Sequence, residues 1–382
     1  MTMAVDKQDK VLNVPTLRFP EFKDEWQKCN VGDYGEVITG NTPPTGDHIN
    51  YADGTHLWAS PADLGKTKFV TDTSTKLSSI GFNKTRKLPE GSILVTCIGS
   101  TIGKMGMAAT EMSTNQQINS IIVNAQNDKH FVYYALQSRF PRYLTSVAIQ
   151  AVPIMSKSSF EKQQNYRTTL EEQKKIGFLL NLIDERISTQ IRIIEDLKQL
   201  RSALYYQIFS NIQGNWVTLK MVGDIAKGKQ INGTELLDEG MYYVMNGGIT
   251  PSGYYNNYNT PANTISISEG GNSCGYVQYN SVPFWSGGHC YNLRIKKSFD
   301  SQYIFHFLKF KELDIMALRI GSGLPNIQKK DLEHFQVLVP DFTTQKKVSG
   351  LFVLINKKEE TEMKLMNAWK MQKKYLLQKL FI

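Results

Sequence analysis

Two long segments of the chain repeat apolar residues at helical spacing. Between Glu171 and Phe209 the sequence contains no proline and a single glycine. Within it, alternate steps of four and three residues reach Ile176, Leu180, Ile183, Ile187, Ile194, Leu197, Leu204 and Ile208, with Gln190 and Arg201 as polar members. The last segment repeats the pattern with Val348, Phe352, Ile355, Met366, Trp369, Leu376 and Leu380, interrupted by Glu359, Glu362 and Lys373. Both patterns predict a long helix with an apolar seam.

A helix over 171–209 would be about 58 Å long, which is too long for one wall of a small domain. Two such helices would bury their seams most simply against one another, and their polar members would set register and direction. An antiparallel pair would place the flanking regions at opposite ends, and it could span one turn of B-DNA, roughly 34–36 Å. A paired-helix spacer in a protein that does not bind DNA fits the same pattern.

The regions before each long helix differ from the helices in composition and in their hydrophobic pattern. Residues 31–160 are rich in Gly, Thr and Asn and contain short alternating runs such as Ile118–Val123, which predict strands and turns. A helix is expected over Lys129–Ser138.

The chain is an internal repeat with an offset of 172 residues. Gly99 and Gly103 fall on Gly271 and Gly275, and the run 173–175 (Gln-Lys-Lys) falls on 345–347. Further upstream, the run 31–33 (Val-Gly-Asp), which follows Trp26, resembles the run 222–224, which follows Trp216, at an offset of 191. The first copy should therefore carry 19 extra residues between about positions 40 and 91. Such a difference fits either a change of specificity or neutral drift of a loop.

Composition narrows the class of protein. The 382 residues include 44 Lys and Arg against 35 Asp and Glu, a net charge of +9, which makes a polyanionic partner plausible without deciding it. The four cysteines are scattered, which argues against a disulfide framework or a zinc module. Residues 1–10 lack the apolar core of a signal peptide, and the apolar run 351–355 is too short to cross a bilayer. We expect a cytoplasmic protein.

None of the runs that partly resemble a catalytic or cofactor-binding motif matches that motif fully. The run Thr42-Pro-Pro-Thr45 lacks the Asn or Asp and the aromatic residue of an amino-methyltransferase motif. Gly99-Ser-Thr-Ile-Gly-Lys104 has too few residues between its glycines for a phosphate-binding loop, and Met105 stands where Ser or Thr would hold magnesium. The Gly-rich run that follows Glu269 does not match a dinucleotide fingerprint, and no Glu-x-Lys follows Asp341 to form a nuclease metal site.

The two Gly-rich turns are better explained as DNA contacts. Glycine permits positive φ and a close approach of the backbone to a duplex. Between and after the glycines, Ser, Thr, Asn, Lys and Tyr could bond phosphates or base edges. The candidates are Ser100, Thr101 and Lys104 in the first copy and Asn272, Ser273 and Tyr276 in the second. Alternatively, each turn only connects two strands of a hairpin.

Other polar residues are candidates for the same role. Asn and Gln can pair bidentately with adenine, and Lys and Arg can anchor phosphates. These candidates are Asn115, Gln116, Gln117, His289, Lys157, Lys329, Lys84, Arg86 and Arg319. The competing interpretations are satisfied turns for the amides and solvated surface charge for the cations. Trp26, Trp216, Phe209 and Phe381 are expected to be packing residues.

Three motifs resemble one family. They are the run Leu17-Arg-Phe-Pro-Glu-Phe22 before Trp26, the run Glu171-Glu-Gln-Lys-Lys-Ile176, and its continuation Leu182-Ile-Asp-Glu-Arg-Ile187. With the duplicated plan, they resemble the specificity (S) subunit of type I restriction-modification systems over essentially the whole chain. The second helix departs from the pattern, with Asn356 in place of Asp184 and Thr343-Thr344 in place of Glu171-Glu172.

The resemblance implies an α/β protein with two target-recognition domains of twisted, mostly antiparallel sheet, joined by two long antiparallel coiled-coil helices in a pseudo-twofold repeat. The segments would be 1–165, 166–210, 211–340 and 341–382, and residues 11–25 would form a strand-like segment near the C-terminal helix. Such a subunit is not an enzyme. It would read a bipartite site in double-stranded DNA, one domain per half-site, and bind two methyltransferase subunits and, through the complex, two restriction subunits. The methyltransferase would methylate adenine with S-adenosylmethionine.

Two other classes of protein remain open from the residues alone. One is a single-chain DNA-modifying enzyme, which the missing cofactor motif disfavours. The other is a scaffold that binds no DNA, in which the helices dimerise and the β-rich domains bind protein.

Overall fold

The computed structural model describes residues 13–145, 153–321, 323 and 325–382. Two compact units divide the chain. The first combines the residues up to Ile191 with Lys364–Ile382, and the second is Arg192–Met363. Because the division falls within both long helices, each unit joins one β-rich domain to one portion of each helix. Residues 1–12, which include the N-terminal run 1–10 and the first two positions of the segment 11–25, lie outside the described residues.

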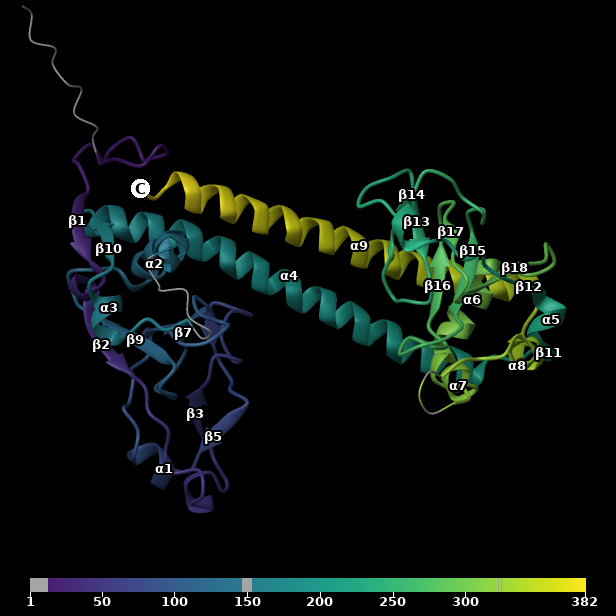
Figure 1. The fold of residues 1–382 in the computed structure, drawn as a ribbon, viewed down its shortest axis with the longest axis horizontal. Helices are drawn as coiled ribbons and strands as arrows, with labels where there is room; N and C mark the ends of the chain where they lie inside the picture. Colours follow the sequence, from purple (N-terminus) through teal and green to yellow (C-terminus); the bar gives the residue numbers. More distant parts are fainter. Residues whose placement is uncertain (1–12, 146–152, 322, 324) are drawn as a thin grey trace, which may run out of the picture. The chain divides into compact units, whose positions relative to one another are not determined.

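The first unit is built on a mixed, mainly antiparallel sheet in the order β2-β9-β6-β7-β4, with a smaller sheet β5-β3-β8 and the pair β1-β10 (Figure 1). Short alternating runs form these strands, and polar turns end them. The elements are β1 Gln27–Asn30, β2 Gly35–Thr39, β3 His56–Ala59, β4 Phe69–Val70, β5 Thr75–Leu77, α1 Ser79–Asn83, β6 Ile93–Thr96, β7 Met105–Ala108, β8 Ser113–Thr114, β9 Ile118–Val123, α2 Lys129–Leu144, α3 Lys157–Glu161 and β10 Gln164–Arg167.

The second unit repeats this plan with the sheet order β12-β18-β15-β16, the smaller sheet β14-β13-β17 and the pair β11-β19. Its elements are β11 Asn215–Thr218, α5 Leu219–Val222, β12 Gly223–Lys227, β13 Tyr242–Met245, β14 Gly253–Tyr255, β15 Thr264–Ser268, β16 Val277–Asn280, β17 Trp285–Ser286, β18 Cys290–Ile295, α6 Ser301–Phe310, α7 Glu312–Ala317, α8 Lys329–His334 and β19 Gln336–Val339. The mostly antiparallel α/β fold and the internal repeat are confirmed.

Strand register corrects the expected size of the insertion. Gly35 pairs with Val123, and Gly223 pairs with Ile295. The second residues of these pairs differ by 172 positions and the first by 188, so the first copy has 16 extra residues and not 19. The extra residues lie mainly between β3 and β5, where β4 forms, and between β5 and β6, where α1 forms.

The error came from matching the run 31–33 with the identical run 222–224, because an offset of 188 makes Val31 equivalent to Leu219. Lys28 pairs with Tyr166 and Trp216 pairs with Leu338, so Lys28 is the structural equivalent of Trp216. Trp26 is a packing residue as predicted: it is 2% exposed and its ring contacts Phe131 at 5.6 Å. Trp216 is 59% exposed and its ring lies 6.2 Å from that of Phe307, so it packs against the core with only part of its surface. The two tryptophans are therefore not equivalent, although each precedes one of the matched runs.

The two long helices are α4, Leu170–Asn211, and α9, Phe342–Lys379, drawn in teal and yellow in Figure 1. Every residue assigned to the two seams is buried or partly buried, while their neighbours on the helix surface are mostly exposed. The polar members follow the same rule: Gln190, Glu359 and Glu362 are buried. The predicted seams are therefore confirmed. No helix in the described part of the chain is both long and apolar enough to cross a membrane.

The helices run antiparallel. In the second unit, Arg201 of α4 bonds Glu359 of α9 at 2.7 Å, and further along α4 the ring of Phe209 lies 5.9 Å from that of Phe352. Residue numbers thus rise along one helix as they fall along the other. Arg201 also donates to Asn356 Oδ1 at 3.0 Å. The 172-residue repeat relates this pair to Lys373 and Asp184 in the first unit, whose closest N–O distance is 2.7 Å.

Each β-rich domain is attached to its long helix by one glutamine of the Gln-Lys-Lys run. Gln173 accepts from the backbone N–H of Asp128 at 3.0 Å, and Gln345 accepts from that of Asp300 at 2.9 Å. Asp128 and Asp300 in turn cap the N-termini of α2 and α6 through their carboxylates. Both glutamines are buried, so each amide holds two elements together at a site without competing water.

The segment before β1 packs on the end of α9, as expected, but its described residues form no strand. Leu17 N–H donates to the carbonyl of Lys379 at 2.9 Å. Arg18 forms a bidentate pair with Glu172 at 2.7 and 2.8 Å, and Glu172 is fully buried. This bond raises the pKa of the Arg18 guanidinium. At the equivalent position of the second copy, Thr344 bonds Asp341 instead, which explains the departure from the helix-start motif.

We expect Glu172→Gln to lower the free energy of unfolding by about 3–5 kcal/mol, because a largely buried Arg18 would lose its counter-charge. Chemical denaturation of the full chain measures the change. Glu171→Gln is the matched control, since Glu171 is the exposed neighbour in the same helical turn. Equal small effects of the two substitutions would contradict this role, whereas the double variant R18M/E172L should recover most of the loss.

Candidate nucleic-acid interface

The two Gly-rich turns are hairpin loops with the same backbone. One joins β6 to β7 and the other joins β15 to β16, both antiparallel pairs. Gly103 and Gly275 both have φ of +91°, a conformation that glycine adopts without strain. A Cβ on Gly103 would lie 2.8 Å from the ring of Phe140, so the turn also packs closely on α2. The hairpin interpretation is therefore correct, and it leaves the role of the exposed turn residues open.

Matching hydrogen bonds bring three separate segments to one edge of each domain. The N–H of Gly99 donates to the carbonyl of Pro153, and that of Gly271 donates to Pro325, both at 3.0 Å. The residue after each central strand is bonded as well: Glu269 N–H donates to the His289 carbonyl at 2.9 Å. The glycine turn, the loop before α3 or α8, and the loop before β9 or β18 therefore meet in each copy.

In the second copy this edge contains a cavity of about 570 Å³. It brings together three predicted residues, Asn272, Ser273 and His289. The other lining residues are Lys227, Asn246, Gly247, Gly248, Glu269, Gly270, Gly271, Pro325 and Asn326. Amide, hydroxyl, imidazole, ammonium and carboxylate groups thus surround one opening, a donor and acceptor set suited to base edges and phosphates.

Glu269 is the acidic residue of this cavity, and the neighbouring polar side chains are arranged around its carboxylate. Its carboxylate accepts from Lys227 Nζ at 2.6 Å and from the Tyr291 hydroxyl at 3.1 Å, and His289 Nδ1 lies 3.9 Å away. Burial, reinforced by the Glu269 charge, raises the pKa of Tyr291 to about 12, so the phenol stays a donor. A carboxylate held in this way can accept from the exocyclic amine of cytosine, and a neighbouring lysine can donate to guanine or phosphate.

In the first copy, contacts through Asn41 gather several predicted residues at the corresponding edge. Asn41 donates its side-chain amide to the Lys84 carbonyl at 2.9 Å and accepts from the Arg86 N–H at 2.9 Å. Its own N–H donates to the carbonyl of Thr114, next to the three-residue amide run. The Arg86 guanidinium is held at the end of β2 by the carbonyl of Thr39, at 2.6 Å.

The amides of that run have different environments. Asn115 is buried and donates to Gln117 Oε1 at 3.0 Å, so it stabilises its own turn and is not placed to contact bases. Gln116 is exposed and accepts from the hydroxyl of Thr42. Gln117 is half-buried, and its amide nitrogen lies 3.5 Å from the Cβ position of Gly99, beside the turn that carries Ser100 and Thr101.

The remaining candidates neither line the cavity of the second copy nor take part in the contacts through Asn41. The ring of Tyr276 lies 4.0 Å from Lys309 Nζ, and burial raises the pKa of its hydroxyl. Lys104, its equivalent, lines a different cavity. Lys157 and Lys329 begin α3 and α8 and pair with acids one helical turn later, at 3.7 and 3.5 Å. Such exposed pairs are weak, about 0–1 kcal/mol, so both lysines stay available to phosphates. Arg319 is exposed, next to the bridge between Ile320 and Asn326.

Lys227, Asn246 and Glu269 are lining residues that the sequence analysis missed. Lys227 ends β12, Asn246 follows β13 and Glu269 follows β15, so each lies at the end of a strand or directly after it. That position was a usable signal, because strand ends that converge on one sheet edge often carry functional side chains. Among the described residues, no group of three His, Cys, Asp or Glu side chains is placed to hold a metal ion.

Comparison with known proteins identifies the family. The sequence model of the type I restriction modification DNA specificity domain matches the chain twice, over residues 23–199 and 214–368. The chain belongs to this family. Each match contains one of the edges described above, and DNA sequence recognition within a type I restriction-modification system is its function.

Individual relatives agree with this assignment. A putative type I specificity subunit of Mycoplasma genitalium is 25% identical over 273 residues, covering 66% of this chain and 71% of its own. The HindI specificity subunit of Haemophilus influenzae is 35% identical over 126 residues, which cover 32% of this chain and 27% of its own. Because the relatives are specificity subunits, the prediction of a non-catalytic chain is confirmed.

Solved structures support the fold. The crystal structure of a type I S subunit from M. genitalium superposes with a TM-score of 0.71 at 21% identity, over 97% of this chain and 99% of the other. A chain from a structural study of complex assembly and conformational transition in a type I system gives 0.54 at 14% identity, over 93% and 97%.

We expect Glu269→Gln to change base preference at one position of the recognised DNA, because an amide donates as well as accepts. Loss of one well-placed base contact corresponds to about 1–3 kcal/mol, or roughly 10–100-fold in discrimination. Competitive binding of the assembled complex to duplexes substituted at single positions measures it. Glu239→Gln, an exposed site on the same unit, is the control. An unchanged preference in a stably folded E269Q chain would remove Glu269 from the interface.

Proposed function

We propose that this chain reads a bipartite site in double-stranded DNA, with one recognition domain for each half-site. One observation carries the proposal: the two specificity-domain matches contain edges with the same backbone and different side chains. Glu269 and His289 of the second copy correspond to Cys97 and Gln117 of the first by the 172-residue repeat. Two recognition edges that share a backbone but carry different side chains could contact two different half-sites.

Affinity and specificity would come from different residues. Arg86, Gln116 and Gln117 in the first domain, and Glu269, Asn272 and His289 in the second, carry the groups that distinguish base edges. Lys157 and Lys329 occupy equivalent exposed positions at helix starts, where they would bind phosphates whatever the sequence. The net charge of +9 supports the second role.

We further propose that the long helices bind two methyltransferase subunits, and through them two restriction subunits. Leu182 of α4 is 41% exposed and Leu354 of α9 is 67% exposed, and the repeat places them at equivalent positions outside the seam. Equivalent apolar positions support two equivalent docking sites. The methyltransferase would carry S-adenosylmethionine and methylate adenine, and the complex would act in the cytoplasm.

The two rival functions make different predictions. A single-chain DNA-modifying enzyme would methylate DNA from S-adenosylmethionine without a partner. A scaffold that binds no DNA would show no salt-dependent binding to a bipartite duplex even in the assembled complex. Either result would contradict the proposal.

Exchange of one recognition domain tests the assignment of half-sites. Replacing residues 31–160 with the same region of a relative of different specificity should change one half of the methylated motif and preserve the other half and the gap. The readout is the methylation pattern of DNA from cells that carry the chain and its methyltransferase partner. A reciprocal exchange over the second domain is the matched control, and it should change the opposite half.

Three outcomes would contradict the proposal. If both halves change, or neither does, the two domains do not read separate half-sites. If the unaltered chain and its partner yield no methylation that the partner alone lacks, the proposed partnership is wrong.

A further inference from the structure

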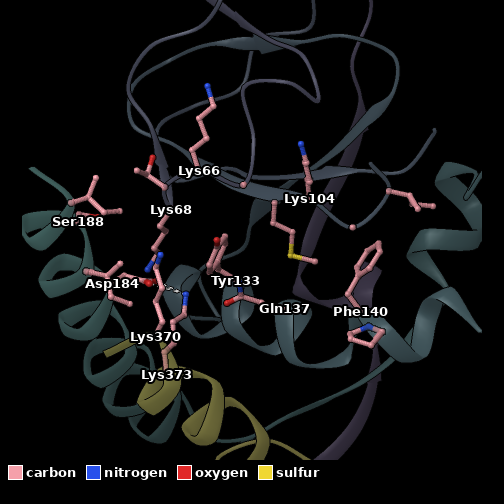
Figure 2. Close-up of a pocket in the computed structure, with 18 of the residues that line it drawn as sticks. Lys66, Lys68, Lys104, Tyr133, Gln137, Phe140, Asp184, Ser188, Lys370 and Lys373 are labelled. Atoms are coloured by element: carbon pink, nitrogen blue, oxygen red, sulfur yellow. Dashed lines mark hydrogen bonds and ion pairs between the residues drawn. The ribbon is translucent and has the colours of Figure 1, made fainter. Parts of the chain in front are cut away.

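The first unit contains a cavity of about 450 Å³ that adjoins its recognition edge, because Ile102, Gly103 and Lys104 of the Gly-rich turn line it. It lies between the β-rich domain and the helices α2, α4 and α9 (Figure 2). Five of its lining residues are lysines: Lys66, Lys68, Lys104, Lys370 and Lys373. Figure 2 shows Lys66 and Lys104 on the side of the β-rich domain and Lys370 and Lys373 opposite them, on α9.

The one acidic side chain in the wall is already neutralised. Asp184 accepts from Lys373 Nζ at 2.7 and 3.0 Å and from the Tyr134 hydroxyl at 2.6 Å. Lys68 is also committed, because its ammonium contacts His130 Nδ1, Tyr134 and Asn181 at 2.7–3.0 Å. Burial lowers the pKa of Lys68 to about 7, so this lysine adds only part of a charge near neutral pH.

Three of the five lysines lie on the rim of the cavity and are not paired with an acidic side chain in the part of the chain that the structure describes. Within the described residues, no acidic group lies within ion-pair distance of Lys66, Lys104 or Lys370. The aliphatic carbons of Lys104 lie 3.5 Å from the Cβ position of Gly65, so its stem rests on the turn that carries Lys66. On the wall, the Gln137 amide has a buried oxygen without a partner, and rotation of the amide would offer its NH₂ group to a ligand.

The second copy has two acidic residues at positions that correspond to this cavity. The repeat places Tyr276 at Lys104, Lys309 at Gln137, Glu312 at Phe140 and Glu360 at Ser188, whereas Lys198 keeps the charge of Lys370. Lys309 donates to Glu312 at 2.5 Å beneath the ring of Tyr276. Lys66 and Lys68 belong to the longer β3–β5 connection of the first copy. The cationic cavity is therefore a feature of the first domain and not of the shared scaffold.

We propose that Lys66, Lys104 and Lys370 form a phosphate site that holds the DNA backbone beside the first half-site, independently of base sequence. This inference rests on the proposed function, since it assumes that the chain binds DNA. Three uncompensated ammonium groups around one opening match the charge of adjacent backbone phosphates. The site makes the two half-sites unequal: the first domain contributes more sequence-independent affinity than the second.

The test is the salt dependence of DNA binding by the assembled complex. We expect the triple variant K66Q/K104Q/K370Q to reduce the slope of log Kd against log salt concentration by about two to three, because each lost phosphate contact removes roughly 0.9. The methylated motif should stay the same. The variant K23Q/K28Q/K162Q removes the same charge from exposed positions on the same unit and should change the slope much less.

A second arm distinguishes backbone phosphate from a free phosphate ligand. Calorimetric titration with tripolyphosphate should show binding that the triple variant loses, and tripolyphosphate should compete with DNA. A slope no smaller than that of the control variant would overturn the proposal. Tripolyphosphate binding lost in the triple variant without a change in DNA slope would overturn the assignment to DNA. If the unaltered complex fails to bind a bipartite duplex, the proposed function fails and not this site alone.

Discussion

The fold of each unit depends on the buried glutamine that fastens a recognition domain to a long helix. A single amide accepts from the backbone of Asp128, or of Asp300 in the second copy, while the same aspartate caps the following helix. In the first copy this contact is tight, because a Cβ on Gly177 would lie 2.4 Å from Asp128 Oδ1. Because the backbone of α2 or α6 is fixed to its helix, the sheet packed on it, and the edge that the sheet carries, are fixed as well.

The two copies share this backbone arrangement and differ mainly in their solvent-exposed side chains. Polar pairs between the helices keep their positions and change their chemistry, from Lys373 with Asp184 to Arg201 with Asn356. The recognition edges keep their backbone hydrogen bonds, while one carries Arg86 and amides and the other carries Glu269, Lys227 and His289. The side chains at the recognition edges can therefore change while the backbone and the helix contacts stay the same. A protein that recognises two different half-sites requires this property.

Local patterns in the sequence predicted the long helices, the strands and the duplication correctly. The seams, the strand Ile118–Val123 and the repeat all depend on spacing along the chain, which the sequence records directly. The offset of the first strands was wrong because the run 31–33 has an identical counterpart, 222–224, that lies three residues after its structural equivalent. Glu269 and Lys227 were missed because only pairing between distant strands brings them together. Asn115 was taken for a possible base contact, although its position in a tight turn makes it bond to its neighbour.

The central claim is that two separate edges read two separate pieces of DNA sequence. Mapping the methylated adenines in DNA from cells that carry this chain and its partner subunits tests it most directly. The account predicts one motif in two specified parts, separated by a gap of constant length in which any base occurs. A single uninterrupted motif, or two parts whose separation varies from site to site, would contradict it.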